Sequence, residues 1–328
     1  MTAADPIRTV LFGLGKMGRF HYKTLQQDPN FELLAVVDPV VRALPDKAGH
    51  VQLLREPDPL WDMSLQAAVV AAPTPSHHAL VKMLLQREFG VLVEKPVAST
   101  SGEAGELLEL AAEKGLSLAV GHVERCNPAV MALRDVWASG ILGQAVHVHA
   151  IRGGPAPAAG THSNVILDLA VHELDVVTQL LGNISLEHVA MHCRTGEKTP
   201  DTAEIQLSSG AGATASVHVN WLSPQKIRRL RVTGSEAVCE IDYLQQACKL
   251  WGADLYQRES LLTAAFKRDT EEAFAESIDM LIQPRHSLEI QLDQFRRYFN
   301  SEDHILCTGD GIATSMRLVD EILGWSCR

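Results

Sequence analysis

Residues 7–18 read Ile-Arg-Thr-Val-Leu-Phe-Gly-Leu-Gly-Lys-Met-Gly. The first half is an apolar run of the length of a short buried strand, and the second half has the spacing G-x-G-x-x-G. In such a turn Gly13 permits the tight bend, Gly15 lets the backbone approach a pyrophosphate, and Gly18 allows close packing of helix on strand. The stretch therefore predicts a dinucleotide site at the start of a helix. The alternative is a glycine-rich turn that holds no ligand.

A second apolar run, residues 32–38, ends in a carboxylate. Asp38 lies 20 positions past Gly18, where a dinucleotide fold places the acid that accepts a hydrogen bond from the adenosine ribose 2′-hydroxyl. A negative charge at this point repels the 2′-phosphate of NADP, so the sequence favours NAD. Arg42 is close enough along the chain to reach such a phosphate, but we interpret it as a solvated surface charge.

Three further apolar runs end in turns that contain proline, glycine or charged residues. They are residues 67–72 before Pro73-Thr74-Pro75-Ser76-His77, residues 91–93 before Glu94-Lys95-Pro96, and residues 116–120 before Gly121-His122. Strands that alternate with helices pair in parallel, which gathers these turns at one edge of the sheet. The expected cofactor site is Gly13, Gly15, Lys16, Met17, Gly18, Asp38, Pro73, Thr74, His77, Glu94, Lys95 and Pro96.

The second half of the chain changes pattern at about residue 144. Alternating apolar and polar residues, without helices between them, predict a largely antiparallel sheet. The predicted strands are 145–152, 186–193, 203–207, 213–220, 226–233 and 237–241. Helical spacing predicts helices at 165–181, 287–299 and 311–323, and the first of these ends at Gly182, a natural C-cap. We therefore expect a Rossmann domain over residues 1–122 and a second α/β domain over residues 123–328.

The predicted helix 165–181 carries Asp168 and His172 four positions apart, with Asp175 further along. In an α-helix this spacing puts Asp168 and His172 on one face, where the carboxylate can orient the imidazole. A surface ion pair or a hydrogen-bonded core histidine is the alternative. Apolar residues surround the pair, however, and a charged pair among them needs a reason.

Composition excludes several classes of protein. The chain of 328 residues is 46% hydrophobic and has a net charge of −11, which disfavours disorder and general nucleic-acid binding. The 6 cysteines form no C-x-x-C pair, so we expect no metal site and a reducing cytoplasm. No apolar run approaches the ~18 residues of a membrane helix, and no leader segment is evident, so we expect a soluble chain.

Taken together, these motifs resemble one enzyme family. The glycine motif, Asp38, the turn at 73–77, the motif at 94–96 and the pair Asp168 and His172 resemble the glucose-fructose oxidoreductase, inositol dehydrogenase and MocA family. Within it, residues 121–128, 166–175 and 220–228 are most similar to enzymes that oxidise C3 of UDP-N-acetylglucosamine. The resemblance implies a Rossmann domain followed by an α/β domain with an open, mostly antiparallel sheet. The exposed face of that sheet commonly forms a homodimer or homotetramer interface.

Oxidation of an alcohol by NAD requires a base that takes the hydroxyl proton. The resemblance places the lysine of the Glu-Lys-Pro motif near the nicotinamide, so Lys95 or His172 is the expected base, with Asp168 orienting His172. A sugar nucleotide also brings a diphosphate, which basic and amide side chains bind. We expect the substrate site to include Glu124, Arg125, Asn127, Arg152 and His172.

Two other functions stay open. One is oxidation of a free sugar, polyol or inositol, which uses the same cofactor site without a diphosphate site. The other is a regulatory protein that senses cofactor or sugar without turnover, which the presence of Lys95, Asp168 and His172 disfavours. A 3-keto sugar nucleotide is suited to transamination, so a downstream aminotransferase is a plausible partner.

Overall fold

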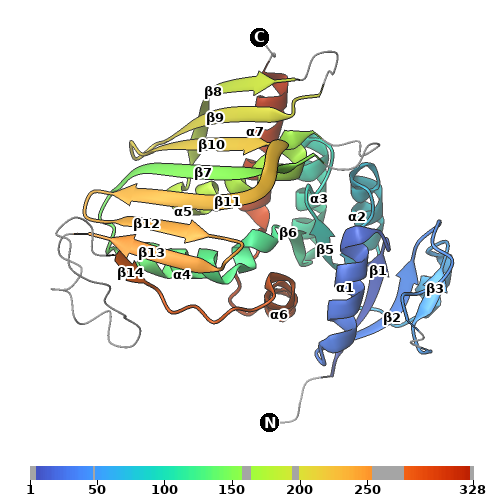
Figure 1. Cartoon of the computed structure of the whole chain (residues 1–328). Coiled ribbons are helices and arrows are strands. Elements are labelled where there is room, and N and C mark those ends of the chain that lie inside the picture. The colour runs from blue at the N-terminus through green and yellow to red at the C-terminus, as the bar shows by residue number, and fades with distance from the viewer. Residues whose placement is uncertain (1–4, 47–48, 157–163, 194–198, 253–276, 326–328) are drawn as a thin grey trace. The chain divides into compact units, whose positions relative to one another are not determined.

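The computed structural model describes residues 5–46, 49–156, 164–193, 199–252 and 277–325 (Figure 1). Its contacts divide the chain into two units. Residues 1–126 and 286–316 form the first unit, and residues 127–285 and 317–328 form the second. The expected domain boundary at residue 122 lies near the end of the first segment. The sequence pattern assigns the segment 286–316 to the second domain, but its contacts group it with the first unit. Contacts between residues distant in sequence leave no local pattern, so the sequence alone does not predict this grouping.

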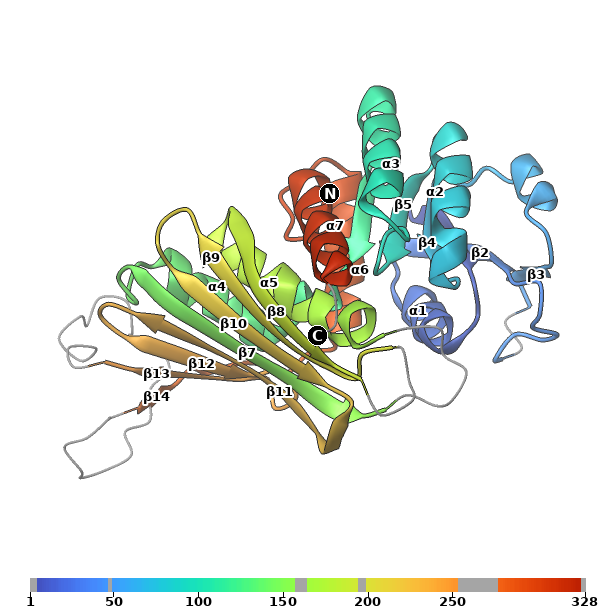
Figure 2. The same ribbon diagram turned by 90° about the horizontal axis from the view of Figure 1, so that it is seen from above.

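The first unit is built on a parallel sheet whose strand order is β3-β2-β1-β4-β5-β6. The strands are β1 (Ile7–Phe12), β2 (Phe31–Val37), β3 (Gln52–Leu54), β4 (Ala67–Val70), β5 (Gly90–Glu94) and β6 (Leu118–Gly121). Its helices include α1 (Lys16–Gln27), α2 (His77–Gln86), α3 (Ser101–Lys114) and α6 (Ser287–Phe299). Figure 2 shows α2 and α3 on one face of this sheet and α1 on the other. The strand order reverses between β1 and β4, which is where doubly wound sheets bind ligands.

Helix α3 shows how local sequence sets an element boundary. The Thr100 hydroxyl accepts a hydrogen bond from the Glu103 backbone N–H at 3.2 Å, and the Glu103 carboxylate accepts one from the Ser99 N–H at 2.9 Å. The first contact satisfies a donor that the first helical turn leaves without a partner, and the second holds the residue before the N-cap. The helix ends at Gly115, whose φ of +63° suits glycine.

We expect Thr100→Ala to lower the free energy of unfolding by about 1 kcal/mol, because the N-cap acceptor is lost. Urea unfolding followed by circular dichroism measures the change. Thr100→Ser keeps the hydroxyl and is the control, with an expected change within ~0.5 kcal/mol. Equal losses in both variants would show that the methyl group, rather than the cap, stabilises this helix start.

The second unit is built on a sheet whose strand order is β14-β13-β12-β11-β7-β10-β9-β8. The strands are β7 (Ala145–Pro155), β8 (Ile184–His192), β9 (Thr202–Ser209), β10 (Thr214–Asn220), β11 (Leu222–Gly234), β12 (Val238–Asp242), β13 (Ala247–Trp251) and β14 (Ser277–Asp279). Only β7 and β10 pair in parallel among these described strands. The expected fold class, a Rossmann domain with an α/β domain on a mostly antiparallel sheet, is confirmed. The short strands β3, β13 and β14 were not predicted.

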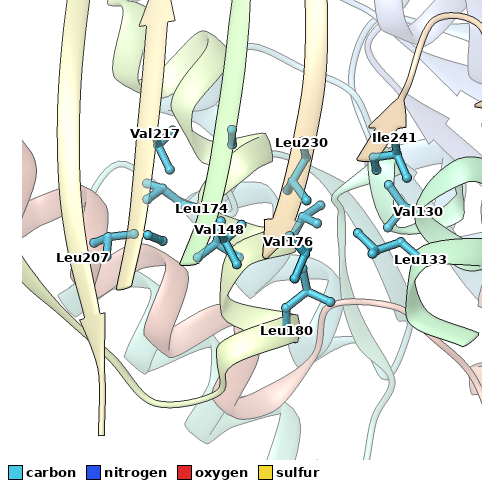
Figure 3. Close-up of a cluster of buried hydrophobic side chains, with 14 of the residues drawn as sticks. Val130, Leu133, Val148, Leu174, Val176, Leu180, Leu207, Val217, Leu230 and Ile241 are labelled. Carbon is cyan, nitrogen blue, oxygen red and sulfur yellow. The ribbon is translucent and has the colours of Figure 1, made fainter. Parts of the chain in front are cut away.

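One face of this second sheet carries the apolar core. Figure 3 shows Val148, Val217 and Leu230 from the strands directed toward Leu174 and Leu180 of helix α5 (Val171–Leu181). Helix α4 (Pro128–Ala138) and the end of helix α7 (Gly309–Gly324) contribute further buried residues. The strands alternate as predicted, because every second side chain points to this core. The opposite face carries polar residues such as His149 and Arg231, and its expected role as an oligomer interface stays a prediction.

The predicted helix 165–181 differs from a regular α-helix at its start. Residues Ile166–Ala170 form a π-helical turn, and α5 follows from Val171 to Leu181. The side chain of Asn164 accepts a hydrogen bond from the Leu167 N–H at 2.9 Å, and its carbonyl accepts one from the Asp168 N–H at 3.0 Å. A π turn is wider than an α turn, so the expectation that Asp168 and His172 share one helix face, which assumed α-helical spacing, does not apply unchanged.

Among the described helices, none has the length and apolar character that crossing a bilayer requires.

Candidate active site

The first unit contains a cleft at the point where its strand order reverses. Its volume is about 1020 Å³. The lining includes all of the predicted cofactor residues except Gly18 and Pro96, namely Gly13, Gly15, Lys16, Met17, Asp38, Pro73, Thr74, His77, Glu94 and Lys95. The turns after β1, β2, β4 and β5 thus share one cavity, as the carboxyl ends of parallel strands do.

The glycine turn between β1 and α1 fits a dinucleotide pyrophosphate. Gly13 has a φ of +88°, and a Cβ there would lie 2.6 Å from the carbonyl oxygen of Ala71. A Cβ at Gly18 would lie 2.1 Å from the carbonyl oxygen of Gly13, so both positions exclude larger residues. Gly15 faces open space, since a Cβ there would have no neighbouring atom within 4 Å, and no side chain caps the helix that follows it. The N–H groups of that helix start therefore remain accessible to an anion.

Asp38 lies at the end of β2, and backbone donors hold its carboxylate. One oxygen accepts a hydrogen bond from the Leu14 N–H at 2.7 Å, and the other accepts from the N–H groups of Val40 at 2.8 Å and Val41 at 2.9 Å. Burial alone would raise the pKa of Asp38, but the hydrogen bonds from Val41, Leu14 and Val40 lower it below its usual value. The cleft therefore presents a fixed negative charge, which suits a ribose hydroxyl and repels a 2′-phosphate.

Two basic residues in the cleft were not predicted. Arg19 follows the glycine turn on α1, and Arg55 comes directly after β3. Arg42, the residue whose sequence position brings it near a 2′-phosphate, is not part of the cleft lining. The carboxyl end of β3 shares the edge with the other strand ends, so recognising that short strand would have drawn attention to Arg55.

We expect Asp38→Ser to narrow the preference for NAD over NADP by roughly 10- to 100-fold, because removing one charge weakens the repulsion of the 2′-phosphate. The measurement is the ratio of kcat/KM for the two cofactors. Any loss of folded protein lowers both values equally and leaves the ratio unchanged. Arg42→Ala is the control and should keep the wild-type ratio. An unchanged ratio in Asp38→Ser would show that the charge of Asp38 does not set the cofactor preference.

The strand-end turns on the far side of the cleft are linked by histidines. His77 lies with Nδ1 2.7 Å from the carbonyl oxygen of Pro96 and Nε2 2.7 Å from that of Ala72. Glu94 ends β5, and its Oε1 is 2.8 Å from Nε2 of His21, a residue of α1. These contacts fix the backbone on both sides of Lys95, whose side chain lines the cleft.

The other expected catalytic residues belong to the second unit. Asp168 lies in the π-helical turn, where its Oδ2 accepts a hydrogen bond from Nε1 of Trp221 at 3.1 Å. His172 is half-buried in the first turn of α5, and Asp175 is buried. Trp221 was not predicted as a site residue, although it lies in the segment 220–228 that carried the resemblance. That Asp168 orients His172 stays a prediction.

Three of the expected substrate-binding residues, Arg125, Asn127 and Arg152, have contacts within their own units. Arg125 is 8% exposed, and its Nη1 donates to the carbonyl oxygen of Leu306 at 3.1 Å. Asn127 caps α4 by accepting from the Ala129 N–H at 3.0 Å. Glu124 is also buried.

Arg152 is 1% exposed and pairs with Glu173, with Nε 2.5 Å from Oε1. The charge of Arg152 is thus balanced inside the second unit. Binding of a diphosphate by Arg125, Asn127 or Arg152 stays a prediction.

Comparison with known proteins gives two family matches. The sequence model for an oxidoreductase family with an NAD-binding Rossmann fold matches residues 7–122. The model for the GFO/IDH/MocA C-terminal domain matches residues 130–240. The two matches together span the strand-end turns of the first unit and most of the sheet of the second.

The relatives with similar sequences include two kinds of dehydrogenase. A UDP-N-acetylglucosamine 3-dehydrogenase of Acidithiobacillus ferrooxidans is 28% identical over 75% of this chain and 77% of its own. Inositol 2-dehydrogenase 4 of Saccharopolyspora erythraea is 30% identical over 71% of each chain. Among solved structures, UDP-N-acetylglucosamine 3-dehydrogenase GnnA from Acidithiobacillus ferrooxidans has a TM-score of 0.81 at 20% identity and 96% coverage of both chains. At that identity the structural likeness establishes the fold alone.

Proposed function

The chain belongs to the GFO/IDH/MocA oxidoreductase family and has its NAD-binding Rossmann domain, and we propose that it is a sugar-nucleotide dehydrogenase. The reaction is oxidation of the C3 hydroxyl of UDP-N-acetylglucosamine to a 3-keto sugar nucleotide. The observation that carries the proposal is the cleft in which the glycine turn, Asp38 and Lys95 line one cavity. The relative named as a UDP-N-acetylglucosamine 3-dehydrogenase supports this substrate.

Residues of the cleft and the expected catalytic residues of the second unit each have a part in this reaction. The N–H groups after Gly15 bind the pyrophosphate, and Asp38 accepts hydrogen bonds from the adenosine ribose. Bound NAD supplies the hydride acceptor, and the alcohol carbon loses its hydride as its oxygen loses a proton. Lys95 or His172 takes that proton, and Asp168 orients His172.

The substrate diphosphate needs donors, and our candidates for this role are Arg125, Asn127 and Arg152. Glu124 is a further candidate for contact with the substrate. Charge-assisted hydrogen bonds from arginine suit a diphosphate, because its oxygens accept two at once. We further propose that the protein is a cytoplasmic homodimer or homotetramer that associates through the polar face of its second sheet. Its product would suit an aminotransferase, since a keto group is what transamination consumes.

A second candidate function is oxidation of inositol or another free polyol. The 30% identity to an inositol 2-dehydrogenase favours it, because that identity exceeds the one to the sugar-nucleotide enzyme. It requires the same cofactor cleft but no diphosphate site.

A screen of substrates tests the proposal. We expect NADH formation at 340 nm with NAD and UDP-N-acetylglucosamine, and a product two mass units lighter whose carbonyl NMR places at C3. The panel includes other UDP-sugars, myo-inositol and glucose. Turnover of inositol or glucose with none of any UDP-sugar would establish the second candidate. Cofactor binding without turnover of any alcohol would indicate the sensing function.

A further inference from the structure

The outer end of the cofactor cleft presents an arginine that the fold itself does not use. Arg55 follows β3 directly and lines the same cleft as Asp38. It is exposed, and it makes no ion pair or side-chain hydrogen bond with another residue that the structure describes. Arg19, the other unpredicted arginine of the lining, donates instead to the carbonyl oxygen of Leu14 at 3.4 Å. The guanidinium of Arg55 is therefore able to contact a bound molecule.

The backbone fixes where Arg55 stands relative to Asp38. Val37 of β2 is in register with Leu54 of β3, and the Asp38 N–H donates to the carbonyl oxygen of Leu54 at 2.9 Å. Asp38 and Arg55 are thus the residues that follow two paired strand ends. Paired strands lie about 4.8 Å apart, so the two side chains start from adjacent points on the rim of the cleft.

Asp38 does not hold this arginine. Its carboxylate accepts hydrogen bonds from the N–H groups of Leu14, Val40 and Val41, and in the described part of the chain no ion pair joins it to Arg55. The backbone donors therefore fix the carboxylate without the help of a cationic side chain. Two opposite charges line one rim, and each can act on a different group of the same ligand.

The lining near Arg55 is apolar. The turn after β2 contributes Pro39, Val40 and Val41, and Pro57 lies two residues beyond Arg55. Val40 is 75% exposed, which is unusual for a valine whose own N–H is tied into the turn. Apolar side chains beside the flat face of a guanidinium suit an aromatic ring, on which arginine stacks. A phosphate would find few donors among them.

The order of the strands matches the order of groups in a dinucleotide. The glycine turn that fits the pyrophosphate follows β1, Asp38 follows β2, and Arg55 follows β3. In the adenosine half of NAD, the pyrophosphate is joined to the ribose and the ribose to the base. With the pyrophosphate at the glycine turn and the ribose at Asp38, the base comes next, at the end of β3.

We propose that the guanidinium of Arg55 stacks on the adenine ring of the bound dinucleotide. The proposal rests on the proposed function, in which this cleft binds NAD. Adenine is common to NAD and NADP, so Arg55 sets the affinity for the adenosine half of either cofactor. The choice between the two stays with Asp38. A competing role for Arg55 is an ion pair with the 2′-phosphate of NADP, which the same experiment detects.

The test measures dissociation constants by calorimetry in the substrate-free protein, with NADH, NADPH and ADP-ribose as ligands. Arg55→Ala removes the plane and the charge, Arg55→Lys keeps the charge without the plane, and Arg55→Tyr keeps a plane without the charge. Arg42→Ala is the matched control, because Arg42 is exposed and does not line the cleft. Circular dichroism confirms that each variant is folded.

We expect Arg55→Ala and Arg55→Lys to raise the dissociation constant for NADH by about 5- to 10-fold, as loss of a partly exposed stack does. Arg55→Tyr should stay within about twofold of the wild type, because an aromatic ring also stacks on a base. The same factors should apply to ADP-ribose, which lacks the nicotinamide, and to NADPH. Arg42→Ala should change none of them.

Three results would overturn the proposal. They are an unchanged affinity in Arg55→Ala, wild-type affinity in Arg55→Lys, and a loss confined to NADPH. The last would assign Arg55 to the 2′-phosphate.

Binding separates this inference from the proposed function, since it requires no sugar substrate. The expected pattern of affinities without turnover of any UDP-sugar would keep the role of Arg55 and reject the substrate. A wild-type protein that does not bind NADH would reject both. In an active enzyme, Arg55→Ala should raise the KM for NAD by a similar factor with kcat within about twofold, because the stack is the same in the ground state and the transition state.

Discussion

Lys95→Met and His172→Ala are each expected to lower kcat by roughly 10²–10⁴-fold. Removing a group that takes or stabilises the transferred proton costs about this much. Methionine keeps most of the volume of lysine, so the loss at residue 95 reports the amine. The measurement is steady-state NADH formation with the substrate that the screen identifies.

Cofactor binding is the control for both variants. His172 lies in the second unit and the cleft lining in the first, so NADH affinity should survive His172→Ala. Lys95 lines the cleft, yet the glycine turn and Asp38 should hold NADH in its absence. Asp168→Asn should reduce kcat less than His172→Ala does if Asp168 only orients the imidazole. Near-wild-type turnover in either single variant would show that the residue has a structural role and not a catalytic one.

The cofactor cleft could be predicted from the sequence because short local patterns determine which residues form its turns. A strand of six residues, a glycine spacing and a carboxylate at the end of the next strand are each short-range signals. The turns after β4 and β5 were predicted for the same reason, since parallel strand ends must meet at one edge. The residues that these patterns identify line one cavity in the structure, and no knowledge of long-range contacts was needed to predict them.

The parts that were not predicted depend on contacts between distant segments. The pair of His21 and Glu94 joins residues 73 positions apart, and no periodicity encodes such a contact. Arg152 was predicted to bind a diphosphate because a basic side chain suits an anion, and that role stays a prediction. The structure gives it a buried carboxylate partner from α5, which only the tertiary fold brings near. The π-helical turn before α5 was hidden because its apolar spacing resembles that of an α-helix.

Glu173→Ala is expected to lower the free energy of unfolding by about 3–5 kcal/mol. Glu173 is 0% exposed, and its Oε1 pairs with Nε of Arg152 at 2.5 Å. Its Oε2 accepts a hydrogen bond from the hydroxyl of Tyr243 at 2.7 Å. Removing one partner of a buried ion pair leaves the other charge without compensation, and that penalty is the source of the large effect. Urea unfolding measures it.

Two further variants separate the charge from the hydrogen bond. Tyr243→Phe keeps the ion pair and loses one hydrogen bond to a charged group, so we expect a cost of about 1.5–3 kcal/mol. The double variant Glu173→Ala with Arg152→Met removes both charges and should be more stable than Glu173→Ala alone. A double variant that is less stable than the single one would mean that Arg152 stabilises the unit by contacts other than this pair.

The single variant Arg152→Met decides what Arg152 does in the enzyme. If Arg152 is occupied by Glu173, Arg152→Met should destabilise the protein and leave the KM for a UDP-sugar within about threefold. If Arg152 instead binds the substrate diphosphate, Arg152→Met should raise that KM by roughly 10-fold or more, with kcat retained, because uniform binding is lost. Its burial at 1% exposure favours the first result. A free sugar as second substrate is the control, since it has no diphosphate and its KM should change only if the whole site is disturbed.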